Sequence, residues 1–331
     1  MSELRVAVAG LGYWGPVIAR NFASHPRTCL TALVDLRKER IEAAQQNLKN
    51  VPGFTDLDDA LPHCDVVALS TPVSTHFELA MKALKAGKHL FIEKPITRTS
   101  EEAEILVKEA QKRGLVIVVD HILLFQGMVR KVKEIIASGE LGDINFFYSV
   151  RANLGLFQTD DINVIWDLAP HDLSMMLYFL GEPASCLQPA GEAHLPAGLI
   201  DDIHMHYRYP KNLVATIYLS WLSPFRQRMT VIGGSKKTVA FSDLWQGEEI
   251  RVYDRHVTSE LVDGTWRYSY HRGGIVIPEI SRHEPLKLEI DEFAAAILDG
   301  KPMTSDGNFG LQIVRLLEKC DQSLRHPNGG H

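Results

Sequence analysis

A glycine-rich turn between a short apolar strand and a helix constrains the fold of this chain more than any other feature. Residues 4–9 have the pattern of a buried strand and lead into Gly10-Leu-Gly-Tyr-Trp-Gly15, after which a helical pattern begins at Pro16. In such a turn Gly10 allows the tight bend, Gly12 lets the backbone approach a pyrophosphate, and Gly15 allows close packing of helix on strand. The helix N-terminus then offers free N–H groups to the anion.

An acidic residue at the end of the next predicted strand supports the same interpretation. Asp35 follows the apolar run 30–34, where a carboxylate would hydrogen-bond the adenosine ribose hydroxyls of a dinucleotide. Its charge would repel a 2′-phosphate, which favours NAD. Arg37, Lys38 and Arg40 follow closely and would bind such a phosphate if Asp35 turned away, so NADP stays open. The alternative to a dinucleotide site is a tight structural turn.

Strands and helices continue to alternate through the first third of the chain. Apolar runs at 66–70, 90–92 and 115–119 are separated by helical patterns that end near Ala86 and Arg113. Alternation of this kind predicts a doubly wound parallel sheet that is covered on both faces. We therefore expect an α/β fold whose first domain is a NAD(P)-binding Rossmann domain over residues 1–121.

The pattern changes after Asp120. Extended runs at 203–209, 213–221, 228–232 and 238–241 follow one another without helices between them. Such a succession predicts an open, mostly antiparallel sheet in a second α/β domain over residues 122–331, which would bind substrate and support oligomerisation. Helices can cover one face of this sheet, and pairing of the other face would make a homodimer or homotetramer.

Composition and charge exclude several classes of function. The 331 residues carry a formal net charge of -6, which gives no support to a nucleic-acid partner. The longest apolar runs are too short to span a bilayer, and no signal peptide is recognisable. The four cysteines are widely scattered and form no C-x-x-C pair or zinc spacing. These features predict a reduced cytoplasmic protein without a membrane partner.

Three residues have side chains suited to alcohol–ketone chemistry. Asp167 and His171 are four residues apart on a predicted helix and therefore share one face. An imidazole titrates near neutral pH and can accept the proton of an alcohol, while a neighbouring carboxylate orients it. Lys94 ends a short predicted strand and could stabilise developing alkoxide charge. The alternative for Asp167 and His171 is an ordinary i,i+4 pair at a helix surface.

Other polar residues are weaker candidates. His76 and His121 come shortly after predicted strand ends, the side on which open α/β sheets bind ligands, although either could be a capping or packing histidine. Arg151 and Asn153 share one face of a predicted strand and could meet substrate, or could be polar residues of a sheet surface. His204 and His206 could join His171 on a metal, but no third spaced ligand is evident, and we predict no metal site.

Several segments together resemble the glucose–fructose oxidoreductase / inositol dehydrogenase / MocA (Gfo/Idh/MocA) family over nearly the whole chain. VAVAGLGYWG resembles its dinucleotide fingerprint, and TPVSTHFELAMKALKAGKHLFIEKPIT resembles its most recognisable block, with Glu-Lys-Pro at 93–95. KVKEIIASGELGDI resembles the segment leading into its second domain, and WDLAPHDLSM resembles its Asp-x-x-x-His helix. Together these segments are much more specific than any one motif.

The resemblance implies an NAD(P)-dependent dehydrogenase or reductase that acts on a CH–OH group of a sugar or cyclitol. It implies that Lys94 contacts substrate and nicotinamide, that His171 is the acid/base, and that Asp167 orients the reacting hydroxyl. The segment 153–172 looks closer to members that act on sugar nucleotides, typically at the sugar C3. The predicted cofactor-binding residues are Gly10, Leu11, Gly12, Tyr13, Trp14, Gly15, Asp35, Ser70, Thr71, Pro72, His76, Glu93, Lys94 and His121.

Two other functions stay open at this point. The first is a reductase of a non-sugar cyclic carbonyl, imine or dihydrodiol in the same frame. The second is a dinucleotide-sensing protein without turnover, because fold alone does not determine function. Lys94, Asp167 and His171 argue against the second, since a sensor would not need all three.

Overall fold

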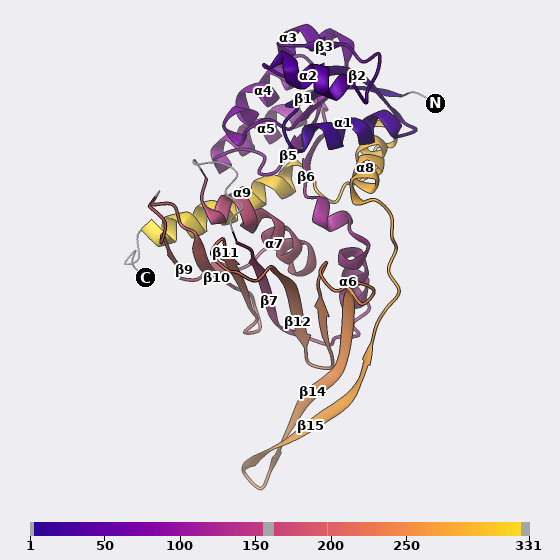
Figure 1. Ribbon diagram of the computed structural model, residues 1–331. Coiled ribbons are helices and arrows are strands. Elements are labelled where there is room, and N and C mark those ends of the chain that lie inside the picture. Colours follow the sequence, from indigo (N-terminus) through magenta and orange to yellow (C-terminus); the bar gives the residue numbers. More distant parts are fainter. Residues whose placement is uncertain (1–2, 155–161, 197, 326–331) are drawn as a thin grey trace. The chain divides into compact units, whose positions relative to one another are not determined.

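The chain divides into two compact units, which we describe separately (Figure 1). A computed structural model describes residues 3–154, 162–196 and 198–325. The first unit comprises Met1–Phe125 and His283–Glu318, and the second comprises Gln126–Arg282 and Lys319–His331. Within the described ranges, no helix is both long and apolar enough to cross a membrane.

The first unit contains a parallel sheet, six-stranded within its described residues, in the order β3-β2-β1-β4-β5-β6. This order reverses direction between β1 and β4, as in a dinucleotide-binding Rossmann fold, and confirms the predicted doubly wound sheet. The strands are β1 (Leu4–Ala9), β2 (Thr28–Val34), β3 (Gly53–Phe54), β4 (Val66–Leu69), β5 (His89–Glu93) and β6 (Ile117–Asp120). The helices before residue 126 are α1 (Gly15–Ser24), α2 (Lys38–Gln45), α3 (Leu57–Ala60), η1 (Leu61–His63), α4 (Val73–Lys85), α5 (Ser100–Arg113) and η2 (Ile122–Phe125).

Two late helices contribute to the first unit, which differs from the predicted division at residue 121. Helix α8 (Pro285–Asp299) buries Leu286, Ile290 and Phe293 in the same core as the strands of the Rossmann sheet. The ring of Phe293 packs edge-on against Phe91 of β5 at 6.0 Å between centroids. Helix α9 (Gly307–Arg325) contributes its residues up to Glu318. The residues that the apolar face of α8 packs against are distant in the sequence. The sequence therefore did not show which of the two sheets this helix would cover.

The second unit contains a mixed sheet, nine-stranded over the residues described, in which β7 and β11 pair in parallel and the other pairs are antiparallel. This confirms the predicted large, mostly antiparallel sheet. Its order is β15-β14-β13-β12-β7-β11-β10-β8, with β9 paired to β10. Its strands are β7 (Ile144–Ala152), β8 (Ser185–Cys186), β9 (Ala190–Glu192), β10 (Asp202–Arg208), β11 (Val214–Ser220), β12 (Gln227–Gly234), β13 (Thr238–Phe241), β14 (Ile250–Val262) and β15 (Thr265–Val276).

Two helices pack within the second unit, α6 (Gly127–Ala137) and α7 (Val164–Leu180). Helix α7 lies against β7, β10 and β11 (Figure 1). Residues alternate along β10 and β11, so that Met205, Tyr207 and Ile217 are fully buried. The opposite face is more open, and Phe146 and Tyr148 of β7 expose 44% and 36% of their surface. The sheet therefore has one covered face and one open face.

A long hairpin of β14 and β15 extends from the edge of this sheet (Figure 1). The sequence patterns did not predict it. Its turn is Asp263-Gly264, and both residues have positive φ, 48° and 76°. An Asp-Gly pair with this geometry is a strong hairpin signal, because it matches the right-handed twist of the flanking strands. The signal was therefore present in the sequence and was missed.

Candidate active site

The glycine loop after β1 has the geometry that a dinucleotide requires. Gly10 has φ 92°, and a Cβ there would lie 2.5 Å from the Ser70 carbonyl oxygen. A Cβ on Gly15 would lie 1.9 Å from the Gly10 carbonyl oxygen, so the helix could not pack this closely with a larger residue. A Cβ on Gly12 would meet only Arg40, at 3.8 Å, which leaves open space above the loop. No side chain caps the start of α1, so its first N–H groups are available to an anion.

Backbone N–H groups hold the Asp35 carboxylate in place at the end of β2. Its carboxylate accepts hydrogen bonds from the backbone N–H of Leu11, at 2.8 Å, and of Arg37, at 2.9 Å. The Arg40 guanidinium is 3.4 Å away and forms an ion pair with it. The carboxylate thus lies at the end of β2 beside the glycine loop, and the residues present fit NAD. Of the other loop residues, Leu11 is buried, whereas Tyr13 is exposed and stacks on Trp14.

His76 joins the β4–α4 loop to the Lys94–Pro95 segment. Its Nε2 is 2.9 Å from the Thr71 carbonyl oxygen, and its Nδ1 is 3.0 Å from that of Pro95. Burial lowers the pKa of His76, which favours the neutral ring. The Lys94–Pro95 peptide is cis. Ser70 and Thr71 are half-buried beside this loop and Pro72 is exposed. We conclude that His76 fixes the loop that carries the predicted cofactor contacts.

Three carboxyl groups cluster at the ends of β5 and β6. Asp120 hydrogen-bonds Glu289 of α8 and Glu93, and its Oδ2 also accepts the indole N–H of Trp14 at 3.2 Å. Burial raises the pKa of all three carboxyl groups, and their mutual repulsion adds to the effect for Glu93 and Glu289. Carboxyl groups in hydrogen-bond contact must share a proton. Burial of the cluster therefore favours the protonated form of its carboxyl groups.

His121 follows this cluster directly. It is fully buried and packs edge-on against Phe309 at 5.5 Å between centroids, and neither of its ring nitrogens has a hydrogen-bond partner among the described residues. Burial lowers its pKa to about 3, with a smaller contribution from the charge of Lys94. His121 is therefore neutral at physiological pH and is poorly suited to act as a general base there.

The carboxyl cluster predicts a specific pH dependence of stability. The pKa of Glu289 is raised in the folded protein, so folding is coupled to proton binding. The contribution of Glu289 to the free energy of unfolding therefore falls as the pH rises above the pKa of the unfolded chain, which is about 4.3. For one group, this fall in the free energy of unfolding reaches about 1.4 kcal/mol per pH unit. Glu289→Gln keeps the hydrogen bond to Asp120 but has no carboxyl group that titrates, so the fall is removed. We expect the thermal midpoint of the variant to fall less steeply than that of the native protein between pH 5 and pH 9, a range that brackets neutrality by about two units.

Glu284→Gln is the matched control, because Glu284 is exposed, lies five residues before Glu289 and carries the same charge outside the cluster. A Glu289→Gln protein with the native pH slope would show that Glu289 is ionised in the folded state.

The second group of predicted residues lies on α7. Asn163 caps this helix, and its side-chain oxygen accepts the N–H groups of Ile165 and Trp166 at 3.1 and 3.2 Å. Asp167 and His171 lie four residues apart on one face and are both half-buried. The indole N–H of Trp221 donates to Asp167 Oδ2 at 3.2 Å. This contact orients the Asp167 carboxylate. It could not be predicted from the sequence, because Trp221 is 54 residues away.

Arg151 forms a buried ion pair with Asp172, the residue after His171. Its Nε lies 2.6 Å from Asp172 Oδ2, and Ser149 donates to Asp172 Oδ1 at 2.6 Å. Asp172 is 1% exposed and Arg151 9%. The pair therefore fixes α7 on β7 next to the predicted acid/base. Asn153 follows the end of β7 and donates its backbone N–H to Ser220. Residues 155–161 of the segment that leads to α7 lie outside the described residues.

The structure overturns the alternative of a metal held by His171, His204 and His206. His204 and His206 lie on the open face of β10, whereas α7 packs against the buried residues of the opposite face. His204 stacks on Tyr218 at 4.5 Å, and His206 Nδ1 is 3.1 Å from the Thr216 hydroxyl. The sheet separates these two histidines from the α7 helix.

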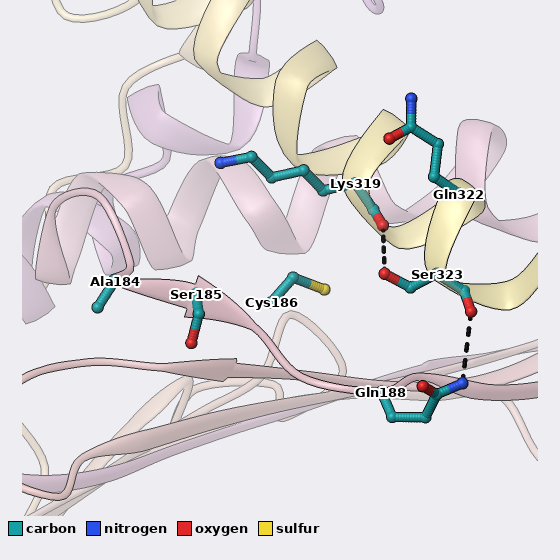
Figure 2. Close-up of a pocket in the computed structure, with 7 residues that line it drawn as sticks. All are labelled: Ala184, Ser185, Cys186, Gln188, Lys319, Gln322 and Ser323. Carbon is teal, nitrogen blue, oxygen red and sulfur yellow. Dashed lines mark hydrogen bonds between the residues drawn. The ribbon is translucent and has the colours of Figure 1, made fainter. Parts of the chain in front are cut away.

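A surface hollow of the second unit lies between the β8 strand and the end of α9 (Figure 2). Lys319, Gln322 and Ser323 line one side, and Gln188 donates to the Ser323 carbonyl oxygen at 3.4 Å. Burial raises the pKa of the Cys186 thiol to about 11, so this thiol is protonated at neutral pH. The hollow contains none of the predicted site residues, and we do not assign it to the active site.

Each unit thus brings together its own share of the predicted residues. The first contains the glycine loop, Asp35, the Thr71–His76 contact and Lys94; the second contains Asp167, His171 and Arg151. Sequence reasoning missed Asp120, Asp172, Trp221 and Glu289. Asp120 could have been found, because it ends a parallel strand on the ligand-binding edge. Glu289 could not, because only packing shows that a helical glutamate is buried.

Comparison with known proteins identifies both units. Residues 4–121 match the family profile described as oxidoreductase family, NAD-binding Rossmann fold, and residues 129–240 match the GFO/IDH/MocA C-terminal domain. A UDP-N-acetylglucosamine 3-dehydrogenase from Acidithiobacillus ferrooxidans is 27% identical over 95% of each chain. Its solved structure has a TM-score of 0.82 and covers 98% of both chains at 25% identity.

Two further relatives carry other names. A 4-carboxy-2-hydroxymuconate-6-semialdehyde dehydrogenase from Sphingobium is 25% identical over 97% of this chain and 99% of the relative. A myo-inositol 2-dehydrogenase from Thermotoga maritima is 23% identical over 97% of this chain and 96% of the relative. Relatives that match over the whole length therefore differ in their substrates.

Proposed function

The chain belongs to the Gfo/Idh/MocA family of NAD-dependent oxidoreductases, and we propose that it acts on the sugar C3 hydroxyl of a sugar nucleotide. The observation that carries this proposal is the full-length similarity to a UDP-N-acetylglucosamine 3-dehydrogenase, at 27% identity. The Asp-x-x-x-His arrangement on α7 supports it, because the carboxylate and imidazole share one helix face.

The proposed residues divide the reaction between them. NAD, when bound, accepts the hydride from the carbinol carbon. His171 takes the hydroxyl proton as the carbonyl forms, and Asp167, held by Trp221, orients the reacting hydroxyl. Lys94 hydrogen-bonds the substrate oxygen and stabilises its negative charge while the proton leaves. In the reverse direction His171 returns the proton to the oxygen.

The test is turnover on a small set of substrates with NAD. UDP-N-acetylglucosamine is offered first, together with other UDP- and dTDP-sugars, and the reaction is followed by NADH absorbance and by the loss of two hydrogens in mass spectrometry. Native mass spectrometry shows whether a dinucleotide co-purifies. Failure of every sugar nucleotide while myo-inositol or a free sugar reacts would refute the substrate but keep the dehydrogenase assignment.

A second candidate is a dehydrogenase of a non-sugar substrate. It is favoured by the similarity to the 4-carboxy-2-hydroxymuconate-6-semialdehyde dehydrogenase, which covers 99% of that protein. Turnover of a hydroxylated or aldehydic ring acid with NAD, in the absence of turnover with any sugar or cyclitol, would establish it. Bound NAD that responds to none of these compounds would support a sensor instead.

We expect Asp35 to set the preference for NAD over NADP. Asp35→Ser removes the charge that faces Arg40 at 3.4 Å. Arg40 then becomes available to a 2′-phosphate. The ratio of kcat/KM for NADP to that for NAD should rise on the order of 10-fold or more, which corresponds to about 1.4 kcal/mol. Addition of Arg40→Gln should reverse the gain, and an unchanged ratio in Asp35→Ser would contradict the assignment.

We also propose that the protein is a homodimer or homotetramer. Large apolar side chains are exposed along the β14–β15 hairpin, where Trp266, Tyr268 and Tyr270 expose 57%, 62% and 71% of their surface. Exposed apolar groups at this density mark interaction surfaces, and the open sheet face adds Phe146. Light scattering at micromolar concentration should give the mass of two or four chains. The mass of one chain would refute the proposal.

A further inference from the structure

Three ligand-type side chains converge on the β14–β15 hairpin, and none of them is proposed above to bind cofactor or substrate. His256 and His271 are directly opposite each other in the antiparallel ladder, and their rings lie 4.7 Å apart. His271 Nε2 is 3.1 Å from Asp254 Oδ2. One ligand atom of each residue lies within 4.8 Å of the others, and this is the only such group of three that the described residues contain.

The backbone of the hairpin leaves room for the Asp254 carboxylate. The ladder shifts register between Tyr253 and Arg255, so that Asp254 faces the pair Gly273-Gly274 in a β-bulge. A Cβ on Gly273 would lie 2.4 Å from Asp254 Oδ2, so the carboxylate occupies the space that a side chain would take. Bulges re-aim side chains in this way, often beside functional sites.

One ring atom of this cluster has no partner. His256 Nδ1 is buried and makes no hydrogen bond within the described part of the chain. A buried polar atom without a partner costs free energy, and in a native protein it needs an explanation such as a missing ion. The nearby cation Lys237 is already paired with Glu140 at 2.8 Å and does not supply one.

We propose that Asp254, His256 and His271 bind a divalent transition metal ion, of which Zn²⁺ is the natural probe. Two neutral imidazoles and one carboxylate are three of the ligands that zinc accepts, with water at the remaining position. The ion takes the place that the hydrogen bond between His271 and Asp254 now occupies, and one ring nitrogen of His256 is the third protein ligand. Because the ligands come from both strands, the ion cross-links the hairpin next to its bulge.

Zinc binding is tested by calorimetric titration of Zn²⁺ into full-length protein that has first been treated with a chelator and dialysed. We expect one ion per chain at micromolar Zn²⁺. His256→Ala and His271→Ala should each weaken binding at least about 100-fold, since even partners outside the ligand set cost 10- to 100-fold when lost. His204→Ala, an exposed strand histidine of the same sheet, is the matched control and should bind as the native protein does.

Two further measurements keep the result interpretable. Gly273→Ala retains all three ligands but places a methyl group 2.4 Å from the Asp254 carboxylate oxygen, and it should also weaken binding. Hydrogen exchange should show Zn²⁺-dependent protection of residues 250–276 in the native protein and in His204→Ala only. No binding at micromolar Zn²⁺, equal binding in the His256 and His271 variants, or protection elsewhere in the chain would each overturn the proposal.

Discussion

His171→Ala is expected to lower turnover on the order of 100-fold or more, the usual scale for the loss of a general acid/base. The imidazole lies on α7, four residues after Asp167 on the same helix face. We assign the proton transfer on this face to His171 alone. The variant should bind NAD as the native protein does, because the cofactor residues lie in the other unit. Single-turnover kinetics and a dinucleotide titration measure the two effects separately.

Lys94→Met is expected to reduce turnover by a similar factor for a different reason. The substitution keeps most of the side-chain volume and removes the ammonium group that would stabilise charge on the substrate oxygen. The contact of His76 is with the Pro95 carbonyl oxygen and should persist. Near-normal turnover in both Lys94→Met and His171→Ala would refute the proposed chemistry. Ser74→Ala, an exposed α4 position, serves as the control.

Arg151→Met is expected to destabilise the second unit by about 3–5 kcal/mol, because it leaves the Asp172 carboxylate buried without its partner. Asp172 is 1% exposed and lies 2.6 Å from the guanidinium Nε, so little water can replace the lost charge. Chemical denaturation in the absence of ligand measures the change. The double variant Arg151→Met/Asp172→Leu should recover most of the stability, since an apolar pair can replace a buried ion pair.

This experiment also separates two roles for Arg151. The sequence predicted a contact with substrate, whereas the structure places its guanidinium on Asp172, next to His171. A variant that keeps native stability and loses only substrate affinity, as a rise in KM, would restore the first role. A variant that loses stability and turnover together, both regained in the double variant, would establish Arg151 as a positioning residue for α7.

The sequence alone predicts those features that depend on residues close together in the chain. The glycines of the first turn and Asp35 at the end of the second strand lie within 26 residues, and their spacing predicts both the turn and the ribose contact. The same holds for Asp167 and His171, which share a face because of the helical repeat. Alternating strands and helices likewise predicted the parallel sheet, since side-chain periodicity reports burial directly.

Only the tertiary structure decided the features that depend on contacts between distant residues. The pKa of Glu289 is raised because folding buries it beside Asp120, 169 positions earlier in the chain (289 − 120). Arg151 meets Asp172 across a strand–helix interface, and Asp254 meets His271 through a bulge in the hairpin. A carboxylate has the same appearance in a sequence whether it is solvated or buried. Its pKa and its partners follow from desolvation and distance, and these are set only when the chain has packed.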